Sequence, residues 1–168
     1  HVTEFISFDG EMSWIESMDD VMAMIEEIVD YVIRGLKERG AEYLKVLDKE
    51  IVVPSRPYPR LTYAECLKMV NDGGLPLKDG DDLGTEGEKI VGDVMAERGY
   101  EMYFIAEYPE EAKPFYIMEK DGTSYSYSFD LDYKGQEISS GGHCHRDWRY
   151  KNRRRKFRHD RRTLLRRK

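Results

Sequence analysis

Three stretches with helical periodicity precede a run of β-patterned segments, and this order is the feature that most limits the fold. Each helical stretch repeats apolar residues on one face and carries start and stop signals at its ends. The signals predict three helices, which begin at the capping pairs Ser17/Asp20, Thr62/Glu65 and Thr85/Glu88 and end at Gly40, before Asn71 and at Gly99.

The β-patterned segments lie at both ends of this helical part. At the start, HVTEFISFDGEMSW alternates acidic and apolar residues as a strand does. After Tyr100, the segments MYFIAEY, KPFYIMEK and YSYSFDLDY are rich in Tyr, Phe and Ile and are separated by Pro or Asp-Gly turns, which predicts consecutive antiparallel strands. Strands at both ends with helices between them predict an α+β domain on an antiparallel sheet.

The charge of the chain is divided unevenly along its length. The net charge of −6 combines a balance of −17 over residues 1–142 with +11 over residues 143–168, where 13 Lys and Arg stand against two Asp. Such asymmetry is typical of a nucleic-acid-binding tail or of an artefact of the reading frame. We therefore expect one globular unit over residues 1–142 and a separate basic tail over residues 143–168.

The start of the chain, its hydropathy and its cysteines indicate the cellular compartment of the protein. The chain begins with His rather than Met, no apolar leader follows, and no apolar run approaches the ~18 residues that a bilayer span requires. Cys66 and Cys144 form no CxxC or zinc spacing, so we expect reduced thiols without a metal. These features predict a cytoplasmic protein without a membrane partner, cut from something longer.

Two carboxylates near the end of the acidic part could form a site. Asp130 lies in a predicted strand, and Glu137 follows the Tyr-Lys-Gly turn, so cross-strand pairing can bring them together. Adjacent carboxylates repel unless a cation or a shared proton intervenes, and magnesium is commonly held by one or two carboxylates plus substrate phosphates. From spacing alone this signal is weak, and a solvated surface hairpin is the favoured interpretation.

Several motifs in register resemble one known family. HVTEF followed by FDGEM resembles the second half of motif 2 of class II aminoacyl-tRNA synthetases, and SFDLDYKGQEISSG resembles the strand pair before their motif 3. The intervening PRLTYAEC, GDDLGTEGE and KPFY are similar to the aspartyl/asparaginyl branch, most closely the archaeal and eukaryotic aspartyl type. The resemblance covers residues 1–142 and implies an incomplete class II catalytic core.

This resemblance implies an activity and its partners. Family members activate aspartate with ATP and Mg²⁺ to form aspartyl-adenylate and then transfer the aspartyl group to tRNA. The full-length family forms homodimers, but the motif that makes the dimer interface is absent from this sequence. Asparaginyl-tRNA synthetases and the related asparagine synthetase share the same motifs, so aspartate and asparagine both remain open as substrates.

The resemblance also assigns roles to individual positions. His1 matches the motif 2 loop histidine at the ATP phosphate, with Val2 beside it at the ATP. Asp130 and Glu137 match the catalytic acidic pair that binds magnesium, and Glu137 also matches a contact to ATP. Ser140 matches the serine at the metal and the amino acid.

Two further acids have a weaker match. Asp9 and Glu11 correspond to acids of the motif 2 strand that shape the amino-acid pocket, with Asp9 as a substrate-binding residue. A solvated strand face is the alternative for both.

The sequence departs from the family at the pocket and at both ends. Family members carry an arginine seven residues after the glutamate that matches Glu137, and Cys144 stands there. Arg146 is nearby, but two residues along a strand displace a side chain by roughly 6.5 Å. Motif 1, the motif 2 arginine and the whole of motif 3 are also missing. We therefore expect the chain alone to be inactive as a ligase.

Two hypotheses account for the basic tail. Codons for a Glu- and Lys-rich family helix, read one base out of frame, encode arginine, so the tail could be a frameshift product. Alternatively, the chain could be a non-catalytic paralogue in which the Arg clusters and the aromatic residues of the tail bind RNA. Resequencing of the encoding DNA separates the two.

Overall fold

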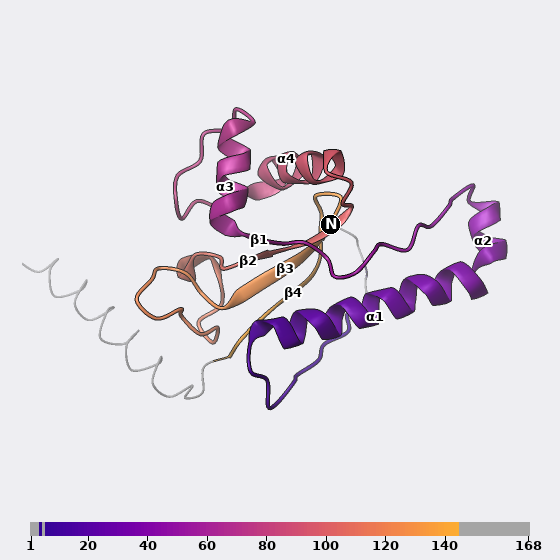
Figure 1. Ribbon diagram of the computed structural model, residues 1–168, viewed down its shortest axis with the longest axis horizontal. Helices are drawn as coiled ribbons and strands as arrows, with labels where there is room; N and C mark the ends of the chain where they lie inside the picture. Colours follow the sequence, from indigo (N-terminus) through magenta and orange to yellow (C-terminus); the bar gives the residue numbers. More distant parts are fainter. Residues whose placement is uncertain (1–3, 5, 145–168) are drawn as a thin grey trace, which may run out of the picture. The chain divides into compact units, whose positions relative to one another are not determined.

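The computed structural model describes residue 4 and residues 6–144 of the chain (Figure 1). The chain divides into two compact units, His1–Ile51 and Val52–Lys168. His1 and Val2 lie outside the described residues, as does the predicted basic tail except for its first two residues.

The first unit contains the helices α1 (Met18–Arg39) and α2 (Ala41–Val46). Helix α1 confirms the predicted start, because Ser17 and Asp20 form a reciprocal capping box. Acidic residues in its first turn and basic residues in its last turn complement the helix dipole. The helix ends at Gly40, as predicted.

The predicted strand before α1 is wrong for the described residues. Residues 6–13 have no regular secondary structure and are exposed. A strand needs a partner whose N–H and C=O groups complete its ladder, and no described segment pairs with this one. Alternation in the sequence therefore predicted the local pattern without the pairing that a strand requires.

The second unit is built on a four-stranded sheet in the order β1-β2-β3-β4. Its strands are β1 (Arg60–Thr62), β2 (Met102–Ala106), β3 (Ser128–Tyr133) and β4 (Glu137–Gly142). Strands β2, β3 and β4 are antiparallel to one another, whereas β1 runs parallel to β2. The α+β class is confirmed, and the sheet is mixed rather than wholly antiparallel.

One predicted strand of this unit is wrong. The segment KPFYIMEK follows the short 3₁₀ helix η1 (Glu110–Ala112) and makes only isolated bridges, such as Ile117 to Cys144. Pro114 lies within it, and a proline has no N–H to donate to a ladder. The segment instead crosses from β2 to β3 as a loop.

Helices α3 (Tyr63–Asp72) and α4 (Gly84–Glu97) differ at their starts. Thr62 and Glu65 form the predicted capping box of α3. The capping pair predicted for α4 is wrong, because the helix already begins at Gly84 and its N-cap makes no side-chain hydrogen bond. Thr85 and Glu88 are therefore inside the helix, and Glu88 is available for another role.

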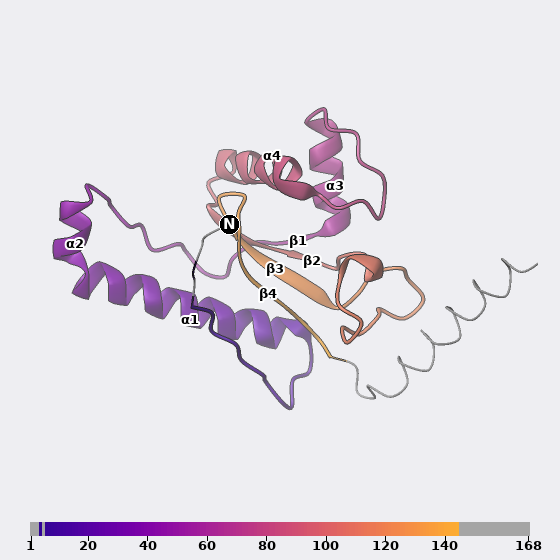
Figure 2. The ribbon, with the colours of Figure 1, turned by 180° about the vertical axis from the view of Figure 1, so that it is seen from behind.

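Both helices pack on one face of the sheet (Figures 1 and 2). The buried core between them and the sheet consists of Tyr63, Cys66, Val70, Leu83, Val91, Met95, Tyr103 and Ile105. This face is important for the site because the neighbouring strand β3 presents carboxylates to it.

Two further predictions concern the described residues. Cys66 and Cys144 are free thiols, the first buried and the second exposed. Among the described residues, no helix is both long enough and apolar enough to cross a membrane.

Candidate active site

The candidate site begins with the alternation of side chains along β3. Tyr103 and Ile105 of β2 pair with Asp132 and Asp130 of β3, and paired residues point to the same face. Because Tyr103 and Ile105 belong to the core under α3 and α4, both aspartates lie on the helix-covered face of the sheet. Asp132 is 2% exposed and Asp130 is 5% exposed, so two carboxylates are buried side by side on one strand.

A bulge in β4 brings two predicted site residues to the same face. Asp130 pairs with Ser140, Leu131 with Ser139 and Asp132 with Glu137, so Ile138 is an extra residue between the last two pairs. Side chains three residues apart on a regular strand point to opposite faces, and one extra residue restores them to the same face. Glu137 and Ser140 therefore both join the aspartates of β3.

This register refines the predicted acidic pair. Glu137 lies directly opposite Asp132 and diagonal to Asp130, instead of pairing with Asp130. Glu137 and Ser140 are exposed, whereas Asp130 is buried. The two predicted metal-binding carboxylates thus lie at different depths of one face.

Glu88 of α4 adds a fourth carboxylate to the three on the strands. Its pKa is raised by burial and by the negative charges of Asp82, Glu137 and Asp130. Burial raises the pKa of Asp132 to about 7, and the charges of Glu88, Asp130 and Glu137 act in the same direction. We call Glu88, Asp130, Asp132 and Glu137 the acidic cluster.

Lys113 is the cation paired with this cluster. Its Nζ donates to both carboxylate oxygens of Asp130 at 2.7 Å, with 16% of the Lys113 side chain and 8% of the Asp130 side chain exposed. The same Nζ lies 3.9 Å from the centre of the Tyr108 ring. Burial and the neighbouring Asp130 raise the pKa of the Tyr108 hydroxyl, which therefore stays protonated.

Hydroxyl groups surround the buried side of the cluster. The Tyr103 hydroxyl lies 3.5 Å from Asp132 Oδ2, and burial raises the Tyr103 pKa above its usual range. Ser126 Oγ donates to the Tyr108 carbonyl at 3.0 Å and lies 2.9 Å from Ser128 Oγ. These bonds satisfy polar groups that would otherwise be costly to bury.

The donor set fits a magnesium ion that is bound partly by protein side chains and partly by the phosphates of a substrate. No three His, Cys, Asp or Glu side chains of the described residues are arranged to hold a metal ion by themselves. Asp130, Glu137 and Ser140 supply carboxylate and hydroxyl oxygens on one face, and magnesium is usually bound by one or two carboxylates plus phosphate oxygens. The residues therefore suit a metal that arrives with ATP better than a protein-only cage.

For the other predicted site residues, the assigned roles stay predictions. Asp9 and Glu11 are exposed residues of the first unit, and Asp9 accepts a hydrogen bond from Ser7 Oγ at 3.2 Å. Cys144, in the position of the family arginine, is exposed, and Arg146 lies outside the described residues.

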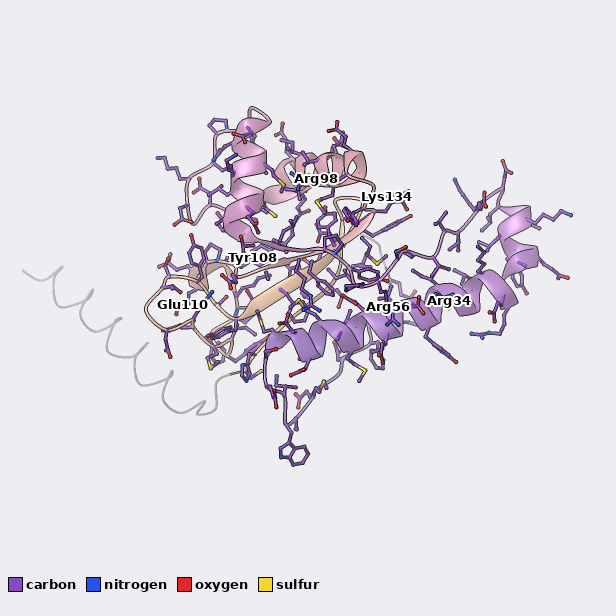
Figure 3. The ribbon with its side chains drawn as sticks, in the orientation of Figure 1. Arg34, Arg56, Arg98, Tyr108, Glu110 and Lys134 are labelled. Atoms are coloured by element: carbon purple, nitrogen blue, oxygen red, sulfur yellow. The ribbon has the colours of Figure 1, made fainter. Side chains whose placement is uncertain are left out.

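Sequence reasoning missed Asp132, Glu88, Lys113 and Tyr108. A signal for Asp132 was available, because the two aspartates of FDLD are two residues apart and must share a face of a strand. Glu88 was assigned to a helix cap. Tyr108 and Lys113 belong to the segments MYFIAEY and KPFYIMEK, which were predicted as strands, but both residues lie in the connection between β2 and β3. Figure 3 shows Tyr108 and Lys134, which lie toward opposite ends of this part of the sheet.

One cavity of the second unit lies away from the acidic cluster. It has a volume of about 410 Å³ and lies among loops, where Asp79, Glu110 and Glu111 contribute carboxylates. Asp130, Glu137 and Ser140 are not among the residues that line it. The side chains of the sheet form the candidate site, because the cavity between the loops has no comparable set of buried charges.

Comparison with known proteins gives the class of the chain. The model of the family "tRNA synthetases class II (D, K and N)" matches residues 1–164. The chain therefore belongs to the class II tRNA synthetases of the D, K and N group. The matched range includes most of residues 143–168, whose separation as a basic tail stays a prediction.

Individual relatives within this class include aspartyl-tRNA synthetases. The aspartate–tRNA(Asp) ligase of Pyrococcus abyssi is 46% identical over 144 residues, which are 84% of this chain and 33% of that protein. Among solved structures, an aspartyl tRNA synthetase from Entamoeba histolytica matches with a TM-score of 0.78 and 28% identity, over 85% of this chain and 30% of that chain. The chain thus spans about a third of the length of these relatives.

A second solved structure is an asparaginyl-tRNA synthetase. The enzyme from Pyrococcus horikoshii, complexed with asparaginyl-adenylate, matches with a TM-score of 0.71 and 26% identity, over 84% of this chain and 33% of that chain. Both amino-acid specificities therefore occur among proteins that share this sheet.

Proposed function

We propose that this chain is part of the catalytic core of an aspartate–tRNA ligase, which activates aspartate with ATP and transfers it to tRNA. The observation that carries the proposal is the shared face of Asp130, Glu137 and Ser140, which the bulge at Ile138 creates. The sequence is 46% identical to an aspartate–tRNA(Asp) ligase over 84% of the chain, which supports the same substrates.

The residues of this face have distinct proposed roles. Glu137 and Ser140, exposed at the edge strand, hold magnesium together with Asp130, and Glu137 also contacts ATP. A magnesium ion at such a site neutralises phosphate charge when bound. Lys113 holds the Asp130 carboxylate in place through its two hydrogen bonds.

Other parts of the proposal rest on the family alone. His1 and Val2 would contact ATP, and Asp9 would contribute to the amino-acid pocket. The full-length protein would be a cytoplasmic homodimer with tRNA as its macromolecular partner. These assignments follow the resemblance of the sequence motifs.

Asparagine is the second candidate substrate. The asparaginyl-tRNA synthetase with bound asparaginyl-adenylate has the same fold over 84% of this chain. The position where the family carries its pocket arginine is Cys144, which has no positive charge for an aspartate side chain. NMR titration of the chain with each amino acid in the presence of an ATP analogue distinguishes the two.

The metal part of the proposal can be tested on the chain itself. Mn²⁺ with ATP, measured by electron paramagnetic resonance, is expected to bind with about tenfold lower affinity to Glu137→Gln, because a carboxylate ligand is lost. The matched control is Glu86→Gln, which removes an exposed acid from the first turn of α4. Equal affinities of the wild-type chain and Glu137→Gln would contradict the proposal.

A further inference from the structure

Helix α4 and the β3–β4 turn approach each other more closely than side chains allow. A Cβ atom added to Gly92 would lie 2.7 Å from the Gly135 nitrogen and 2.8 Å from its Cα. A Cβ atom added to Gly135 would lie 2.7 Å from the Glu88 carbonyl oxygen. Backbone therefore meets backbone at this point, and neither glycine has room for a larger residue.

The turn itself is held from two further directions. Lys134 and Gly135 both have positive φ, 53° and 75°, which a tight turn between antiparallel strands requires. The Lys134 N–H donates to the Glu101 carbonyl at 2.8 Å, and the Tyr103 hydroxyl interacts with the Gly135 backbone. The position of the turn is thus set by α4 above it and by the chain around β2 beside it.

The exposed end of the acidic cluster comes directly after this turn. Glu137 begins β4 two residues after Gly135, and the bulge at Ile138 comes next. A bulge leaves a strand end less constrained by ladder hydrogen bonds, so the register there depends on the turn. A displaced turn would move Glu137 relative to Asp132 more than it would move Ser140 farther along the strand.

We infer that the contact between Gly92 and Gly135 is a positioning device that holds Glu137 opposite Asp132 on the catalytic face. The contact fixes the position of the turn along the axis of α4, and Glu88 lies one helical turn before Gly92 in the same helix. One glycine pair therefore sets the spacing between the carboxylate from the helix and the carboxylate from the edge strand. This inference rests on the proposed function, in which Glu137 binds magnesium and ATP.

The main experiment compares two alanine substitutions in the same helix of the full chain. Gly92→Ala adds a methyl group against the turn, whereas Gly87→Ala meets its neighbours at 3.3–3.6 Å, and both gain the better helix propensity of alanine. We expect Gly92→Ala to weaken Mn²⁺–ATP binding about tenfold and Gly87→Ala to leave it within about twofold, in line with the loss of a supporting residue.

A second readout reports the position of the turn without any metal. Cross-strand amide and Hα contacts between Asp132 and Glu137, measured by NMR, are expected to change in Gly92→Ala and to persist in Gly87→Ala. A general loss of stability would not confine the change to this pair, and thermal unfolding of each variant checks for such a loss. Unchanged contacts and unchanged affinity in a folded Gly92→Ala would overturn the inference.

A further variant covers the case in which Gly92→Ala does not fold. A glycine inserted between Gly135 and Gln136 lengthens the turn by one residue that has no Cβ atom, and lengthening a loop by one residue costs little in chain entropy. It should uncouple Glu137 from the α4 contact and weaken Mn²⁺–ATP binding about as much as Glu137→Gln does. Retained affinity in the insertion variant would overturn the inference.

The same measurements distinguish a failure of the positioning device from a failure of the proposed function. If the wild-type chain and Glu137→Gln bind Mn²⁺–ATP equally, the proposed function fails, while the NMR contacts still report whether the glycine pair sets the register. If Glu137→Gln loses affinity but Gly92→Ala and the glycine insertion do not, the positioning device fails and the proposed function stands.

Discussion

The two faces of strand β3 are both buried but have opposite chemistry. On one face, Phe129 and Leu131 are both 0% exposed, and Phe129 meets Phe104 edge to face with 5.7 Å between ring centres. On the other, Asp130 and Asp132 are 5% and 2% exposed beneath the helices. Burial alone therefore does not separate the structural face of this strand from the candidate catalytic face.

The difference lies in how each face compensates for its burial. Apolar side chains are stabilised by leaving water and need no particular partner. A buried carboxylate needs a counter-charge or a proton, and the two aspartates differ in this respect. Asp130 has Lys113, whereas Asp132 has only hydroxyl and carboxyl neighbours among the groups that shift its pKa, and its pKa rises to about 7.

The largest expected effect is on the apolar face. Phe129→Ala removes a fully buried ring and leaves a cavity, so we expect a loss of about 3–5 kcal/mol in the free energy of unfolding. Urea denaturation of the full chain, followed by circular dichroism, measures it. A loss below about 1 kcal/mol would mean that the site collapses or is solvated, contrary to its burial.

The next effect breaks the ion pair of the polar face. Lys113→Met leaves the Asp130 carboxylate buried without its cation, and we expect a loss of about 3 kcal/mol. Asp130→Asn in the same chain should restore most of that loss, because the uncompensated charge is gone. As a control, Lys68→Met breaks the exposed pair with Asp72 and should cost less than about 1 kcal/mol.

The third prediction concerns Asp132 and pH. Its pKa is about 7 in the folded chain and about 3.9 when unfolded, so the folded state binds more protons between these values. The contribution of Asp132 to stability is therefore fully present below about pH 4 and is lost as the pH rises to about 7. Denaturation midpoints measured from pH 4 to pH 8 should show this decline.

Removal of the Asp132 charge tests the same effect. Each unit of pKa shift corresponds to about 1.4 kcal/mol. Asp132→Asn should abolish the decline, because the side chain no longer titrates. The expected net gain in stability at pH 8 is only about 2 kcal/mol, because the new buried amide must find a hydrogen-bond partner. A wild-type slope that persists in Asp132→Asn would assign the titration to another group, such as Glu88.

The smallest effect is expected for a neutral polar group on the polar face. Ser128 is fully buried and is hydrogen-bonded to Ser126 at 2.9 Å, and Ser126 retains its bond to the Tyr108 carbonyl when the partner is lost. Ser128→Ala should therefore cost about 1 kcal/mol. A cost as large as that of Phe129→Ala would remove the distinction between the two faces.

Much of the fold could be predicted from local signals. The capping boxes at Ser17 and Thr62 are formed by residues three apart, so the sequence contains both partners. The predicted strands over MYFIAEY and YSYSFDLDY also formed, because their β-prone residues found partners. The segments over residues 5–12 and 113–120 had the same kind of pattern but no ladder among the described residues, and pairing is not a local property.

The candidate site divides in the same way. Asp130, Glu137 and Ser140 were selected by their resemblance to the family motif, and their roles stay predictions. The register that unites them depends on a bulge at Ile138, which alternation does not reveal. Glu88 and Lys113 come from a helix and a loop far from β3 in sequence, so only packing brings them to the acidic cluster.

The sequence by itself determined that the aspartates of β3 share a face, because a strand alternates its side chains with a fixed period of two. It also determined the starts of α1 and α3 through residues within one helical turn. Only the tertiary structure decided that Asp130 meets a lysine while Asp132 meets a tyrosine hydroxyl and further carboxyl groups. That outcome depends on distances to Lys113, Glu88 and Glu137 and on the exclusion of water, which are set by contacts between distant parts of the chain.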